Sequence, residues 1–251
     1  MKRLGLGLLV AAMLALAPAV ASAAQARVLV ITETAGFQHD SIPTARGTLK
    51  QLGARSSAYR VVDRAGVREL SPARLRRYDA VVFALTSGEL PLSAAARRGL
   101  IRFVQRGGGF VGVHSATDTL YTFPAYGRLV GAYFRDHPYM SGQLIRTGTR
   151  HPATARQPRR SPIREELYRF RTDPRDRGAR VLLRLDPASV PGAEPGEFLP
   201  VAWCQRFGQG RVYYNALGHF PATWRSGRFR DQLDGAIAWA AGKRAPRRCS
   251  S

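Results

Sequence analysis

Short apolar runs alternate with longer amphipathic segments along most of this chain. Continuous apolar runs are typical of parallel strands that are buried on both faces. The strands predicted in this way cover residues 28–31, 59–63, 80–85 and 110–113. Helices are expected between them, over 41–52 with Ser41 as its cap and Gly53 as its stop, in a short segment from Ser71, and from Ser93 to the glycines at 107–109. The alternation predicts a doubly wound α/β protein with a mainly parallel sheet.

The pattern changes beyond residue 135. Further strands are expected as insertions on one edge of the sheet, followed by a late β-hairpin and a last helix. These elements cover 143–147 and 180–185 for the strands, 201–207 and 211–217 for the hairpin, and 229–241 for the helix, with Pro- and Arg-rich loops at 150–164 and 187–198. No internal repeat is visible, so residues 27–242 are expected to form a single domain, followed by a basic tail at 243–251.

The N-terminus has the pattern of a secretory signal. Lys2 and Arg3 precede an apolar stretch over residues 4–17, and Ala21-Ser22-Ala23 forms a small-residue cleavage site. Residues 1–23 therefore predict a signal peptide, and the mature protein is expected to be periplasmic or extracellular. No later run reaches the about 18 apolar residues that a membrane span requires.

The amino-acid composition and the charge exclude some classes of protein. The chain has 251 residues and a net charge of +22, from 39 Lys and Arg against 17 Asp and Glu. Apolar residues make up 45% of the chain, which excludes a disordered basic protein. The cations are scattered and carry no nucleic-acid-binding motif, so we expect an attraction to anionic surfaces and no nucleic-acid partner. Cys204 and Cys249 could pair in an oxidising compartment, and the sequence leaves this pairing and a homo-oligomeric state open.

Polar residues cluster directly after the expected strands. Because ligands of open α/β sheets bind beyond the carboxyl ends of the strands, these residues are the candidate site. They are His39 and Asp40 after the first strand, Glu89 after the third, His114, Ser115 and Asp118 after the fourth, and His219 after the hairpin. The histidines lack the short spacings of metal motifs, so a divalent metal such as zinc at this cluster stays open.

His114 lies at the centre of a strand-to-helix elbow. The segment Gly112-Val113-His114-Ser115-Ala116 has small residues around a central position that usually exposes a nucleophile to the cleft. Because this position holds a histidine, a Ser or Cys triad is not favoured. Acid–base or metal chemistry is favoured instead. Trp203 is a candidate to pack against a sugar ring, with core packing as the alternative.

These segments resemble the ThuA-like (trehalose utilisation) family, whose fold is similar to class I glutamine amidotransferases. The matching stretches are residues 34–42, 107–118, 165–170, 200–203 and 208–219. The resemblance implies a flavodoxin-like three-layer α/β/α sandwich with His114 where the amidotransferases carry their nucleophilic Cys, so glutaminase activity is not expected. It also implies roles for His137 and Glu166, although Glu165 replaces the first acid of the family's Asp-Glu pair.

The resemblance associates the chain with trehalose catabolism through 3-keto sugars. We therefore expect an exported enzyme that acts on 3-keto glycosides or related oxidised disaccharides, with His114 as base. His39 and His219 would polarise a carbonyl or share a metal, and Glu166 and Asp118 would orient these groups. The residues expected to contact the sugar are Ser115, Asp40, His137, Trp203 and Glu89. The alternatives are a non-catalytic sugar-binding or scaffold module and a metal-dependent hydrolase.

Overall fold

The computed structural model describes residues 24–244 and residue 249. In this part of the chain, nine strands form one sheet in the order β2-β1-β3-β4-β9-β8-β7-β5-β6. The parallel half consists of β2 (Tyr59–Ala65), β1 (Ala26–Ile31), β3 (Ala80–Ala84), β4 (Gly109–Val113) and β9 (Gly210–Asn215). The antiparallel half continues with β8 (Pro200–Phe207), β7 (Arg180–Leu185), β5 (Phe134–Arg146) and β6 (Arg160–Phe170).

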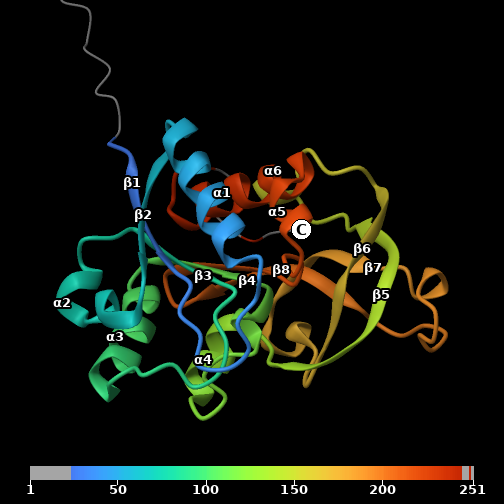
Figure 1. Ribbon diagram of the computed structural model, residues 1–251, viewed down its shortest axis with the longest axis horizontal. Coiled ribbons are helices and arrows are strands. Elements are labelled where there is room, and N and C mark those ends of the chain that lie inside the picture. Colours follow the sequence, from blue (N-terminus) through green and yellow to red (C-terminus); the bar gives the residue numbers. More distant parts are fainter. Residues whose placement is uncertain (1–23, 245–248, 250–251) are drawn as a thin grey trace, which may run out of the picture.

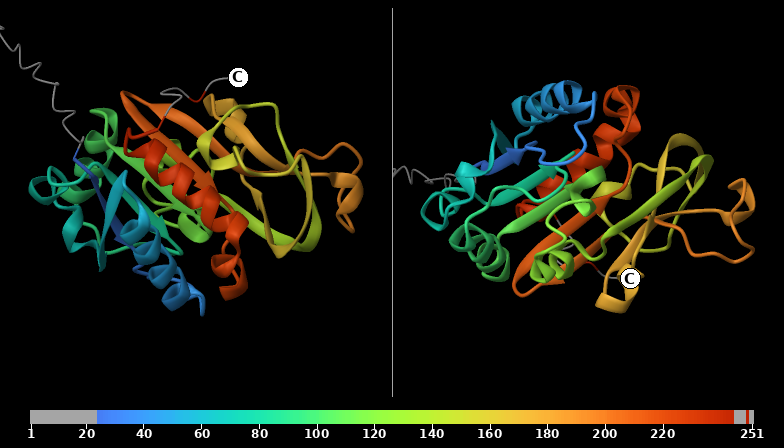
Figure 2. Two further views of the ribbon diagram at one scale, coloured as in Figure 1. Left: turned by 90° about the horizontal axis from the view of Figure 1, so that it is seen from above. Right: turned by 60° about the horizontal axis from the view of Figure 1, so that its bottom comes forward.

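Helices cover both faces of the parallel half (Figures 1 and 2). One face carries α1 (Ile42–Arg55), α5 (Pro221–Arg225) and α6 (Gly227–Ala240), and the other carries α2 (Pro72–Leu75), α3 (Ala94–Gln105) and α4 (Pro124–Val130). The predicted three-layer α/β/α sandwich with a mainly parallel core is confirmed. Parallel connections require such crossovers, and they bury the central strands on both sides.

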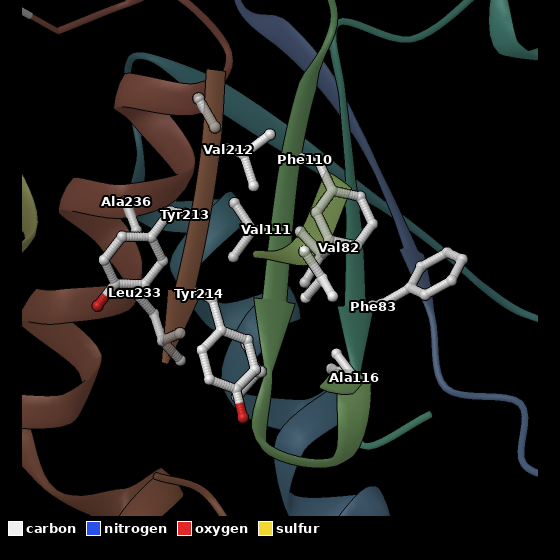
Figure 3. Close-up of a cluster of buried hydrophobic side chains, with 14 of the residues drawn as sticks. Val82, Phe83, Phe110, Val111, Ala116, Val212, Tyr213, Tyr214, Leu233 and Ala236 are labelled. Atoms are coloured by element: carbon white, nitrogen blue, oxygen red, sulfur yellow. The ribbon is translucent and has the colours of Figure 1, made fainter. Parts of the chain in front are cut away.

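The core lies between the central strands and the helices, as Figure 3 shows for α6 against β9 and β4. All five residues of β3 and all five of β4 are buried, which explains why their sequences have no polar face. Val82, Val111, Val212 and Leu233 of α6 are all fully buried. Burying each of these side chains stabilises the fold by about 1.5–3 kcal/mol.

The antiparallel half is longer than the sequence predicted. The hairpin of β8 and β9 is confirmed, but β5 already begins at Phe134. The interpretation of residues 150–164 as a loop is wrong at its end, because β6 starts at Arg160. Pro162 and the exposed arginines of this segment hid the strand, and they are tolerated because β6 is the outermost strand of the sheet.

Two expectations about α1 are also corrected. Ser41 stands at the N-terminus of the helix, but its hydroxyl donates to the carbonyl of Gly218 at 3.1 Å and does not cap α1. Gly53 does not end the helix, which continues to Arg55. A Cβ atom at Gly53 would lie 2.7 Å from the backbone nitrogen of Val61, so the glycine permits close packing of α1 on β2. The predicted cap at Ser93 is confirmed, since its Oγ accepts from the Ala96 N–H at 3.1 Å.

The disulfide that the sequence left open is formed. Cys204 of β8 pairs with Cys249, with their Cα atoms 5.9 Å apart, and ties the end of the chain to the sheet. Across the residues that the structure describes, no helix combines the length and apolar character needed to cross a membrane. The predicted signal peptide at 1–23 and most of the basic tail lie outside the described residues.

Candidate functional site

Three histidines and one glutamate meet at the carboxyl edge of the parallel strands. His39 follows β1, His114 follows β4, His219 follows β9, and Glu166 comes from β6. One possible ligand atom from each of these four residues lies within 4.8 Å of every other. We call these four residues the His–Glu cluster. The predicted convergence of His39, His114 and His219 is thus observed, although they are far apart in the sequence.

The elbow after β4 presents the ring of His114 to the cluster. His114 has a φ of 54°, the left-handed conformation expected for a tight strand-to-helix turn. Its Nδ1 atom lies 2.7 Å from the carbonyl oxygen of Ala216, which can only accept, so Nδ1 carries a proton. The Tyr168 hydroxyl lies 2.9 Å from Nε2. The ring is fully buried, so our expectation that the elbow exposes it to the cleft is wrong.

Glu166 connects the histidines. Its Oε2 atom lies 3.2 Å from His114 Nε2 and 3.1 Å from His219 Nδ1, and its Oε1 atom lies 3.3 Å from His137 Nδ1. Burial favours the neutral acid, but the hydrogen bond from His114 and the charges of the three imidazoles outweigh it and lower the pKa of Glu166 to about 2. The carboxylate is therefore an anion at neutral pH.

The imidazole of His39 is neutral at neutral pH. Only 4% of its surface is exposed, and burial, followed by the neighbouring His114 and His219, lowers its pKa to about 3. Its ring makes edge contacts with those of His114 and His219, with centroids 4.8 and 5.2 Å apart. Its Nδ1 atom is buried and has no hydrogen-bond partner among the described residues. Such a nitrogen is available to a ligand.

The loop that carries His219 is held by buried polar contacts. Glu165 is fully buried, and its Oε1 atom accepts from the N–H groups of Gly218 and His219 at 2.6 and 2.8 Å. The Gly218 carbonyl accepts from the Ser41 hydroxyl at 3.1 Å and from the Trp224 indole at 2.7 Å. Sequence reasoning did not assign this role to Glu165 and missed Tyr168 entirely. Only the curvature of the sheet, which brings β6 back toward β4, reveals them.

The other predicted site residues fall into two groups. Asp118 is half-buried near the cluster, where burial raises its pKa and the Tyr121 hydroxyl donates to it at 2.8 Å. Ser115 is fully buried next to His114, and its Oγ has no hydrogen-bond partner within the described part of the chain. These two residues stay candidates for a role at the site.

Three predicted sugar contacts do not join the cluster. Trp203 is fully buried, donates to the Val130 carbonyl at 2.9 Å and belongs to the core, which corrects our expectation of a sugar contact. Glu89 is held instead by the backbone N–H and hydroxyl of Thr122 at 2.8 and 2.7 Å. Asp40 is exposed.

Comparison with known proteins identifies the family. The ThuA profile, described as trehalose utilisation, matches residues 27–240. The chain belongs to the ThuA family. No curated protein matches it.

Solved structures show the same fold in other ThuA proteins. A ThuA-like protein of Bacteroides uniformis has a TM-score of 0.71 at 19% identity, covering 93% of this chain and 98% of its own. One from Parabacteroides merdae has a TM-score of 0.67 at 20% identity, with 89% and 92% covered. A β-galactosidase of Bacillus circulans has a TM-score of 0.52 at 17% identity, with 85% of this chain but only 30% of its own covered. These likenesses concern the fold alone.

Aromatic rings surround the cluster of this ThuA protein, and sequence reasoning missed two of them. Phe37 packs against His39 and Phe220 against His219, each with ring centroids 4.7 Å apart. Phe134 stacks on His137 at 5.9 Å. Phe37 is 62% exposed, an unusual position for a large apolar side chain. The site thus combines charged and imidazole groups with apolar ring faces, as sites for small organic ligands do.

Proposed function

We propose that this ThuA protein is an exported enzyme that acts on 3-keto glycosides or related oxidised disaccharides by acid–base chemistry at the His–Glu cluster. The observation that carries the proposal is the convergence of three imidazoles on one ionised carboxylate beside the exposed ring of Phe37. The family's association with trehalose utilisation supports a sugar as the substrate.

The geometry favours His137 over His114 as the base. Both nitrogens of His114 are engaged and its ring is fully buried, so a substrate cannot reach it without rearrangement. The side chain of His137 is 50% exposed, and its Nδ1 atom lies 3.3 Å from Glu166 Oε1. A carboxylate in this position orients the imidazole and leaves Nε2 free for a substrate proton.

A 3-keto glycoside needs only one such base to start the reaction. The ketone at C3 acidifies the C2–H bond, so His137 would take that proton and leave an enolate. The enolate then expels the glycosidic oxygen from C1, which forms a C1=C2 double bond and releases the second sugar as an alcohol after protonation. Water can add to this double bond to complete a net hydrolysis. The exposed ring of Phe37 offers a face on which a sugar ring can pack.

Proton NMR of the purified protein with 3-keto-trehalose tests this proposal. We expect loss of the C2 proton signal and release of the second sugar in the wild type, and a loss of rate of about 100-fold or more in His137→Asn. Arg98→Gln is the matched control, since Arg98 is exposed on α3. Substrate binding without turnover in the wild type would favour a sugar-binding module. A loss of less than about tenfold in His137→Asn would remove His137 from the role of base.

A further inference from the structure

We infer that the His–Glu cluster is a binding site for a divalent metal ion of the first transition row, and that zinc is the ion it suits best. The four donors would be nitrogens of His39, His114 and His219 and the Oε2 atom of Glu166. The inference concerns the site described above but does not rest on the proposed reaction.

Two hydrogen-bond acceptors face each other inside the cluster. Because His114 Nδ1 must donate to the Ala216 carbonyl, the neutral ring has only a lone pair on Nε2. That lone pair lies 3.2 Å from Oε2 of Glu166, a carboxylate oxygen that also accepts, so two acceptors face each other and only the Tyr168 hydroxyl, at 2.9 Å, can donate to Nε2. A metal cation between Nε2 and Oε2 would turn this acceptor pair into two ligands of one ion. A hydrogen bond from one imidazole nitrogen to a backbone carbonyl is also the usual way in which a metal-binding histidine is oriented.

A proton between His114 Nε2 and Glu166 Oε2 would satisfy only that pair of atoms. The buried Nδ1 atoms of His39 and His219 both lack a hydrogen-bond partner in the part of the chain that the structure describes. His219 Nδ1 lies only 3.1 Å from Glu166 Oε2 but is not aligned with it as a hydrogen bond. Buried polar atoms without partners are rare and require an explanation. A single cation bound by the cluster would relieve the acceptor conflict and give these imidazoles a partner.

The spacing and the donor types agree with zinc. In a four-coordinate site with bonds of about 2.0–2.2 Å, the ligand atoms are about 3.3–3.6 Å apart. The contacts of Oε2 at 3.1 and 3.2 Å are close to this range, and no pair in the cluster exceeds 4.8 Å. Imidazole nitrogens with one carboxylate suit zinc and its first-row neighbours, whereas calcium and magnesium prefer oxygen ligands alone. Three neutral imidazoles and one anion would leave a bound divalent ion with a net charge of +1.

The Tyr168 hydroxyl is the group that a metal would displace. It lies 2.9 Å from His114 Nε2, and it also interacts with the carboxylate of Glu166. On metal binding, the hydroxyl can therefore keep an acceptor in Glu166 while Nε2 turns to the ion. A bound divalent ion would supply Lewis-acid polarisation to a carbonyl oxygen.

Zinc binding to the purified, untagged protein tests the inference. After treatment with a chelator and dialysis, calorimetry with Zn²⁺ is expected to show one site per chain, and the Co²⁺ form is expected to show visible d–d absorption. His219→Ala is expected to weaken zinc binding by about 100-fold or more, and His39→Ala by a similar factor. His151→Asn is the matched control, because His151 lies outside the cluster, against Trp239 and Tyr213, so zinc affinity is expected to change by less than about threefold.

Two results would overturn the inference. One is a wild type that binds neither Zn²⁺ nor Co²⁺ in stoichiometric amount while its circular dichroism shows a folded protein. The other is equal zinc affinity in His219→Ala and His151→Asn. A zinc-loaded wild type without turnover on 3-keto-trehalose would support the metal site and contradict the proposed function, and turnover by a protein that binds no metal would do the reverse.

Discussion

The Nε2 atom of His114 lies 3.2 Å from the Oε2 atom of Glu166, although β9, β8, β7 and β5 lie between their strands in the sheet. This contact requires the sheet to curve so that its last strand returns over the carboxyl edge of the parallel half. The paired strands β5 and β6 thereby place their side chains beside residues from the parallel half. These side chains are His137, Glu165, Glu166 and Tyr168. The antiparallel extension therefore completes the site that the parallel strands begin.

Replacing Glu165 tests how far the site depends on the loop of His219. In Glu165→Ala, the buried N–H groups of Gly218 and His219 lose their acceptor, which costs about 1–3 kcal/mol for each group. Glu165→Gln keeps an oxygen that can accept from both, so we expect a loss of only about 1 kcal/mol. Urea unfolding and turnover should show the same order, with Glu165→Ala losing at least about tenfold in rate. Equal losses in the two variants would contradict this positioning role.

Phe37 is expected to contribute to substrate affinity and not to stability. Its side chain is 62% exposed, so Phe37→Ala removes little packing from the folded protein. If a sugar ring covers about half of the phenyl surface, the lost burial is about 1.4 kcal/mol, or about tenfold in KM at unchanged kcat. Phe37→Tyr keeps the ring face and should retain the wild-type KM. A KM that is unchanged in Phe37→Ala would exclude this contact.

The sequence predicts the parallel half of the fold well because its strands are continuous apolar runs such as residues 80–85. It also places His39, His114 and His219 together, because parallel strands end at the same edge. It fails for β6, since the outermost strand tolerates Pro162 and exposed arginines that interrupt the pattern. The contacts of Glu165 and Tyr168 depend on the curvature of the sheet, which no local pattern records. The exposure of Phe37 likewise depends on the folded chain, because its sequence neighbours do not distinguish it from a core residue.

His151 is expected to make the protein less stable in acid. Its ring is buried against Trp239 and Tyr213, and burial lowers its pKa to about 3. Between about pH 6.5 and pH 3 the unfolded chain therefore binds a proton at His151 that the folded chain does not, so stability falls as the pH falls. Each pH unit in this range costs up to about 1.4 kcal/mol.

Urea unfolding at several pH values measures this contribution. His151→Asn is expected to be less stable at pH 7, because it loses ring packing, but its stability should fall less steeply between pH 6 and pH 4. The difference in slope should approach one proton per molecule. Parallel slopes in the wild type and the variant would show that His151 is protonated in the folded protein.

The disulfide between Cys204 and Cys249 is expected to stabilise the protein. It closes a loop with a sequence separation of 45, and constraining the unfolded chain in this way contributes about 2–4 kcal/mol. Cys204 is fully buried, so Cys204→Ser would place a hydroxyl in the core. Cys249→Ser removes the bond without this second effect and is therefore the variant to use. Its melting temperature should fall by several degrees and should not respond to a reductant, while that of the wild type should fall in the same reductant.

Because disulfides persist in oxidising compartments, protein isolated from the periplasm or the medium should contain no free thiol. Two free thiols in protein recovered from its native compartment would contradict both the stabilising role and the proposed export.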